Sequence, residues 1–161
     1  MSALGFPTIP GVTDPATAEA PGQMRNDRFT PLPFLVSRVD ADGNDTAGIR
    51  VPEQSVPLAT TTGWNFRSPR VGNPATIYAL VGSYIPLPVT RAEQQRRGDP
   101  RASVEERYAS REAYVQKIRT AAAALIHDRY LLQEDMDSIV ARANAHWDYA
   151  HRAPTTTSAR R

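Results

Sequence analysis

The residues in this sequence best suited to catalysis or metal binding are its three histidines, because imidazole can act as a general base or bind a metal near neutral pH. They are His127, His146 and His151, and none belongs to a His-Glu-x-x-His pair of the zinc-binding type. The spacing between His146 and His151 directs their rings about 140° apart on an α-helix. His127 precedes Asp128, but neighbouring residues within a helix do not face each other. We therefore expect neither a metal centre nor a catalytic histidine.

A cluster of oxygen-bearing side chains could bind a hard cation. Asp40, Asp42, Asn44 and Asp45 resemble the start of a calcium-binding loop, in which alternating oxygen ligands surround the ion. Such a loop needs glycine at its sixth position and glutamate at its twelfth, whereas this chain has Asp45 and Val51 there. We interpret the segment as a turn.

A second acidic group consists of Glu134, Asp135 and Asp137. Paired carboxylates can serve as general acid and base. These three lie where a helix is expected to begin, and negative charge is favourable in a first turn. The group is therefore interpreted as a helix start.

The loop Thr62-Gly63-Trp64-Asn65 is the segment most like a binding site. An aromatic ring and an amide beside a flexible glycine can line a pocket. Trp64 and Asn65 are accordingly our candidate substrate-binding residues. The alternative interpretation is that Trp64 anchors an irregular segment onto a core.

No segment carries a recognisable catalytic or nucleotide-binding motif. A serine hydrolase is typically marked by Gly-x-Ser-x-Gly, and the nearest phrase, Gly82-Ser83-Tyr84, lacks the second glycine. The only lysine, Lys117, lies within a predicted helix, so there is no Walker loop, and no Gly-rich dinucleotide fingerprint is present. We predict no catalytic residue and no cofactor for this chain.

Composition narrows the classes of partner. The 161 residues suffice for one domain. Thirteen basic residues after Val89 are interleaved with ten acidic ones, which does not favour nucleic-acid binding. There is no cysteine, and no apolar stretch approaches the roughly 18 to 20 residues of a membrane span. The first seven residues lack the basic and apolar regions of a signal peptide. We expect a soluble chain and assign no compartment.

The distribution of proline divides the chain. Twelve of the fourteen prolines precede Val89, and nearly all helical periodicity follows it. We expect a Pro-rich irregular segment over 1–33, a β-hairpin with packed loops over 34–88, a helical region over 89–152 and a disordered tail over 153–161. The predicted fold class is α+β, mainly α.

The β-hairpin is expected near the start of the second segment. Phe34–Val39 is strand-like, Asp40–Asp45 has turn chemistry, and Ala47–Val51 can return antiparallel. A hairpin is marginal alone, so its apolar face needs a partner. Val56–Pro88 holds aromatic and aliphatic residues between proline and glycine breaks, which is typical of packed loop more than of regular structure.

Helix signals become sharper along the last segment. A short helix from Thr90 is expected to end at Gly98, and Ser103 with Glu106 forms a capping box. Ser110 can cap a longer helix over 111–129, and another is expected over 134–149, giving a C-terminal helical hairpin. The apolar stripes of these two helices are Tyr114, Val115, Ile118, Ala122, Leu125 and Ile126, and Met136, Ile139, Val140, Ala143 and Trp147.

Several phrases in order carry a resemblance to a known family. They are Phe6-Pro7-Thr8-Ile9-Pro10-Gly11-Val12, Val39-Asp40-Ala41-Asp42-Gly43-Asn44, Ala47-Gly48-Ile49-Arg50-Val51-Pro52, Val56-Pro57-Leu58-Ala59, Thr62-Gly63-Trp64-Asn65, Gly82-Ser83-Tyr84-Ile85-Pro86, Gly98-Asp99-Pro100-Arg101 and Ser103-Val104-Glu105-Glu106-Arg107-Tyr108. Together they resemble the C-terminal end of a bacterial family of large, poorly characterised α/β-hydrolase domain proteins, over about Phe6 to Trp147.

The resemblance implies a parent with esterase-like activity. In that family the nucleophilic serine and the triad histidine lie upstream of the region matched here, so the resemblance assigns no catalytic residue to this chain. The leading hypothesis is therefore a C-terminal accessory or cap portion whose partner is an α/β-hydrolase core. A non-enzymatic interaction module that docks on a separate protein is the alternative, and an independent enzyme with an unfamiliar site is the third.

Overall fold

The structure is a computed structural model that describes residues 37–66, 77–78 and 80–152. The expected Pro-rich segment 1–33, the first residues of the expected strand Phe34–Val39 and the expected tail 153–161 lie outside this part of the chain. Among the described helices, none combines the length and apolar character needed to cross a bilayer.

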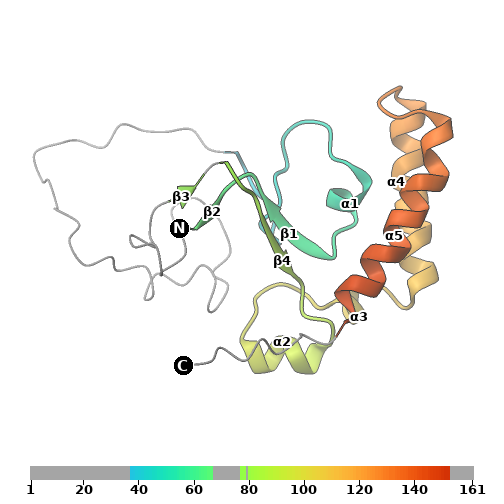
Figure 1. Cartoon of the computed structure of the whole chain (residues 1–161). Coiled ribbons are helices and arrows are strands. Elements are labelled where there is room, and N and C mark those ends of the chain that lie inside the picture. Colours follow the sequence, from blue (N-terminus) through green and yellow to red (C-terminus); the bar gives the residue numbers. More distant parts are fainter. Residues whose placement is uncertain (1–36, 67–76, 79, 153–161) are drawn as a thin grey trace, which may run out of the picture.

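Helices predominate among the described elements, and the remainder is antiparallel β-structure, in agreement with the α+β, mainly α prediction (Figure 1). The elements in chain order are α1 (Pro52–Ser55), β1 (Ala59–Thr62), β2 (Asn65–Phe66), β3 (Ile77–Tyr78), β4 (Ser83–Pro86), α2 (Arg91–Arg97), α3 (Val104–Arg107), α4 (Arg111–His127), the 3-10 turn η4 (Gln133–Asp135) and α5 (Met136–Ala150).

The predicted helical hairpin is confirmed. The Ser110 hydroxyl accepts a hydrogen bond from the N–H of Ala113 and so caps α4, which runs antiparallel beside α5 (Figure 1). The acidic group at 134–137 lies in η4 and the first turn of α5, as interpreted. Burying each large apolar side chain in the seam stabilises the hairpin by about 1.5–3 kcal/mol. The fully or nearly fully buried side chains of the seam are Tyr114, Ile118, Ala122, Ile139 and Ala143.

Local capping signals also place the two short helices correctly. Thr90 accepts from the N–H of Glu93 at the start of α2, and Gly98 ends that helix in the left-handed conformation, with φ of 63°. Ser103 and Glu106 form the predicted capping box at the start of α3. These ends depend on neighbouring residues alone, so the sequence was sufficient to predict them.

The main strand pair lies where packed loop was expected. β1 and β4 form an antiparallel ribbon in which Thr60 lies opposite Ile85, and β2 and β3 form a second short pair. Prediction failed over Val56–Pro88 because each strand has only two or four residues and the pairs are joined across many intervening positions. Leu58 and Leu87 flank the ribbon and are buried in the same core as α4 and α5.

The hairpin expected between Phe34–Val39 and Ala47–Val51 is wrong in its second strand. The chain reverses more tightly, through an isolated bridge between Val39 and Asp45, and 47–51 is a loop. The reason is the Asp40 carboxylate, which accepts from the N–H groups of residues 42 and 44, both at 3.0 Å. Gly43, with φ of 82°, supplies the left-handed step that this turn needs. The turn interpretation itself is confirmed.

A buried guanidinium connects the ribbon to the loop before α3. The side chains of Arg101 and Asp99 are only 1% and 3% exposed, and they form an ion pair of 2.7 Å. Arg101 also donates to the hydroxyl of Thr60 at 2.9 Å and to the carbonyl of Pro86 at 3.0 Å. Burial opposes ionisation of Asp99, but the hydrogen bonds and charge of Arg101 outweigh it and lower the pKa of that carboxyl.

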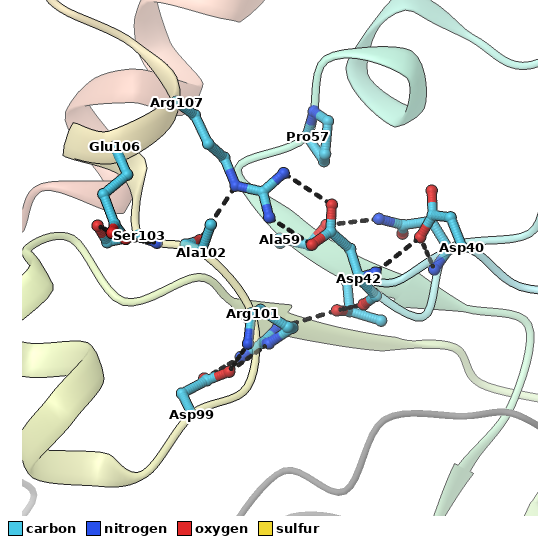
Figure 2. A network of polar contacts seen from close by, with 12 residues as sticks. Asp40, Asp42, Pro57, Ala59, Asp99, Arg101, Ala102, Ser103, Glu106 and Arg107 are labelled. Carbon is cyan, nitrogen blue, oxygen red and sulfur yellow. Dashed lines mark hydrogen bonds and ion pairs between the residues drawn. The ribbon is translucent and has the colours of Figure 1, made fainter.

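A second arginine connects the Asp40–Asp45 turn to α3. Both terminal nitrogens of Arg107 bind the Asp42 carboxylate, and Nε donates to the carbonyl of Ala102 at 3.0 Å. The backbone carbonyl of Asp42 accepts from the Thr60 hydroxyl, which is itself bound to Arg101. Figure 2 shows that these contacts form one continuous polar network between the turn, the ribbon and the α3 segment.

The amide of Asn44 takes the place of a third strand. Its Nδ2 donates to the carbonyl of Ala59 at 3.2 Å, and its Oδ1 accepts from the N–H of Thr61 at 2.8 Å. A neighbouring strand would offer the same donor and acceptor through its backbone. Because Asn44 is fully buried, this pairing fixes the turn against β1.

Three aromatic rings fill the end of the core next to α3. Tyr108 and Tyr114 meet edge to face with centroids 5.1 Å apart, and Tyr114 lies 5.4 Å from Trp147. The Tyr108 hydroxyl donates to the carbonyl of Pro57 at 2.9 Å. The buried Tyr114 hydroxyl, in contrast, has no hydrogen-bond partner among the described residues.

This difference predicts opposite outcomes for two chemically identical substitutions. Tyr114→Phe removes an unpaired buried hydroxyl and is expected to leave the free energy of unfolding unchanged or to raise it by up to about 1–2 kcal/mol. Tyr108→Phe leaves the Pro57 carbonyl without its donor and is expected to cost about 1–2 kcal/mol. Urea denaturation of the two variants measures both values, and equal losses would contradict the assignment.

Candidate functional site

The candidate loop containing Trp64 and Asn65 connects β1 to β2. The carbonyl of Trp64 accepts from the hydroxyls of Thr62 and Ser83, the latter at 2.8 Å. The N–H of Ser83 in turn donates to the Thr62 hydroxyl at 3.2 Å. Both candidate side chains are half-buried. The loop backbone is thus held rigidly at the end of the ribbon, as a preorganised binding loop requires.

Gly82 lets the two strands approach closely beside this loop. A Cβ at position 82 would collide with the backbone carbonyl of Thr62. The glycine of the Gly82-Ser83-Tyr84 phrase therefore serves strand packing, and Ser83 beside it acts as a hydrogen-bond donor to Trp64.

The next residue of β4 forms a polar contact that sequence reasoning missed. The Tyr84 hydroxyl lies 2.6 Å from Nε2 of His146 on α5, although 62 positions separate the two residues. The Tyr84 ring also meets Tyr149 edge to face, with centroids 5.6 Å apart. One helical turn of α5 thus presents an imidazole and a phenol to the ribbon.

Burial determines the protonation of this pair. It raises the pKa of Tyr84 to about 12, with a smaller contribution from Tyr149. It lowers the pKa of His146, an effect that the nearby Glu53 carboxylate partly opposes. Both groups are therefore neutral at pH 7, and the contact is a hydrogen bond between uncharged side chains.

The other two histidines have local partners. His127 Nδ1 lies 3.0 Å from the Asp128 carboxylate, and both side chains are exposed. The expectation that these neighbours do not face each other is wrong, because Asp128 lies beyond the last residue of α4 and has left helical geometry. His151 stacks on the Trp147 ring and its Nδ1 contacts the carbonyl of that residue at 2.8 Å.

Cation binding finds no support in the arrangement of the acidic side chains. Asp40 is occupied by the turn and by an ion pair of 2.9 Å with Arg50, and Asp42 is occupied by Arg107. The side-chain amide of Asn44 is hydrogen-bonded to the backbone of β1. Within the described ranges, no group of three or more metal-binding side chains comes together.

Comparison with known proteins gives one result. The sequence matches the family model described as alpha/beta hydrolase domain over residues 10–141, most of the chain. The chain belongs to the alpha/beta hydrolase domain family. No curated protein and no solved structure matches it significantly. Membership in the alpha/beta hydrolase domain family confirms the family that the sequence phrases indicated, and the mixture of helices with an antiparallel ribbon is consistent with part of such a domain.

The pKa of His146 predicts a specific dependence of stability on pH. The folded chain holds this pKa below the ordinary value of about 6.5, so on acidification the unfolded state takes up the proton first. The stabilisation from neutral His146 is complete above about pH 6.5 and declines as the pH falls below that value. Urea denaturation between pH 7.5 and 5 is expected to show this decline.

Two histidine variants isolate the effect. His146→Gln should lose less stability than the wild type between pH 7.5 and 5, and His127→Gln, which changes an exposed side chain, controls for the loss of an imidazole outside the core. An identical pH dependence for His146→Gln and wild type would refute the assignment.

Proposed function

We propose that this chain is the C-terminal accessory portion of an α/β-hydrolase-like esterase. In this proposal an α/β-hydrolase core, on the same chain or a separate one, supplies the nucleophilic serine and the oxyanion hole for acyl transfer. The accessory portion packs against that core and shapes access to it.

The observation that carries the proposal is the set of contacts made by the histidines. A serine hydrolase places a histidine between a serine hydroxyl and a carboxylate. His146 contacts a tyrosine hydroxyl, and His151 contacts a backbone carbonyl. His127 contacts a carboxylate, and no contact with a serine accompanies it in the described part of the chain. These contacts support a role in which the triad belongs to another body.

Exposed apolar side chains are a second support. Several large apolar side chains of the described residues are exposed, and exposed apolar surface can mark an interaction site where the side chains are contiguous. A hydrolase core packed against them would cover this surface. They are Ile49, Val51, Leu80, Val81, Tyr130, Leu132 and Tyr149.

We further propose that Trp64 and Asn65 contribute to substrate binding in the complete protein. Hydrogen bonds from Thr62 and Ser83 fix the Trp64 backbone, so its indole is presented from a rigid support. An aromatic surface with an adjacent amide suits an ester that has an apolar part and a polar carbonyl.

Reactivity of the isolated chain tests the absence of a nucleophile. The purified 161-residue chain is expected not to hydrolyse p-nitrophenyl butyrate above background and not to be labelled by a fluorophosphonate, which reacts with activated serines. Heat-unfolded chain provides the background for both measurements. Specific labelling of one serine in the folded chain would overturn the accessory role.

Kinetics of the complete protein test the binding residues. Trp64→Ala is expected to raise KM by at least about threefold and to leave kcat within about twofold, because it removes uniform substrate binding. Trp64→Phe retains an aromatic surface and should show a smaller change in KM. A selective loss of kcat in a normally folded Trp64→Ala protein would contradict the proposal.

A further inference from the structure

A shallow depression of about 270 Å³ lies where the ends of α1 and α3 meet the first half of α4. Its volume is close to the lower end of the range for small-molecule sites, which is about 300 Å³. Its lining residues are Ser55, Val56, Pro57, Arg107, Tyr108 and Lys117.

The floor of the depression is apolar and rigid. Val56, Pro57 and Tyr108 are buried or nearly so. The hydrogen bond from the Tyr108 hydroxyl to the Pro57 carbonyl, at 2.9 Å, holds the aromatic ring in place. The part of this floor that remains accessible is therefore preorganised for contact with the edge of an apolar group.

The rim carries one uncompensated positive charge. The guanidinium of Arg107 is neutralised by Asp42. Lys117, the only lysine of the sequence, has its Nζ 5.3 Å from the centre of the Tyr108 ring and donates to the Arg107 carbonyl at 3.4 Å. Among the described residues, no carboxylate lies within ion-pair distance of this ammonium.

We propose that the depression binds a small monocarboxylate with an apolar tail. The Lys117 ammonium has three donors and can bind the carboxylate, while the exposed Ser55 at the rim offers a hydroxyl. The tail lies against Val56 and the Tyr108 ring. A single cation matches a singly charged ligand, and a volume of about 270 Å³ accommodates a tail of one ring. This site is separate from Trp64 and Asn65, and the inference does not depend on the proposed hydrolase core.

The test uses benzoate and its uncharged isostere benzamide. Each is titrated into the ¹⁵N-labelled full chain at pH 7 and low salt, and amide chemical shifts are followed by NMR. Benzoate is expected to shift the amides of Val56, Tyr108 and Lys117 with half-saturation at about 1–10 mM. Benzamide should bind at least about tenfold more weakly, because it lacks the charge that the ammonium recognises.

Two exposed cations on α4 provide matched variants. Lys117→Met keeps an apolar stem and should abolish the benzoate shifts, whereas Arg119→Met, two positions along the same helix, should retain them. The proposal is overturned if benzamide binds as well as benzoate, if Lys117→Met binds benzoate normally, or if benzoate gives no localised shifts up to about 50 mM.

Discussion

The arrangement of the non-helical half depends on the buried guanidinium of Arg101. A two-stranded ribbon is marginal by itself, and a buried charge is tolerated only when its hydrogen bonds are complete. Arg101 supports the ribbon by binding groups of both β1 and β4. The same bonds, together with the ion pair to Asp99, satisfy its buried charge. The ribbon so fixed positions the Trp64 loop at one end and brings Tyr84 to α5. The positions of the Trp64 loop and of the Tyr84 contact with α5 therefore both depend on the ion pair between Arg101 and Asp99.

The sequence predicted those parts of the fold that local interactions determine. The caps at Ser103 and Ser110 lie within a few positions of the helix ends that they organise, and the structure has them as expected. Of the predicted apolar stripe of α4, the core contains Tyr114, Ile118 and Ala122, with Val115 packed against it, but not Leu125 or Ile126. The strands were not predicted because their pairing partners are distant in the sequence. Thr60 pairs with Ile85, and nothing in either short strand indicates the other. The turn was recognised, but its side-chain hydrogen bonds closed it before the expected return strand.

The same distinction applies to the candidate site. The turn was preferred over a calcium loop on spacing alone, and the ion pairs of its aspartates agree with that choice. The sequence analysis treated Asp99 and Arg101 only as part of a family phrase. Their opposite charges on either side of a proline could have indicated an ion pair. The contact between Tyr84 and His146 had no signal, because a strand and a helix from different halves of the chain create it.

The amide of Asn44 has a consequence for how the ribbon meets other molecules. An open strand edge is a template on which a second chain can add a strand. On one side of the ribbon, the exchange of a donor and an acceptor with Asn44 occupies the carbonyl of Ala59 and the N–H of Thr61. On the other side, Pro86 has no N–H and its carbonyl is bound to Arg101. Side chains and a proline thus occupy part of each edge, which reduces the backbone groups available for intermolecular strand pairing without any additional strand.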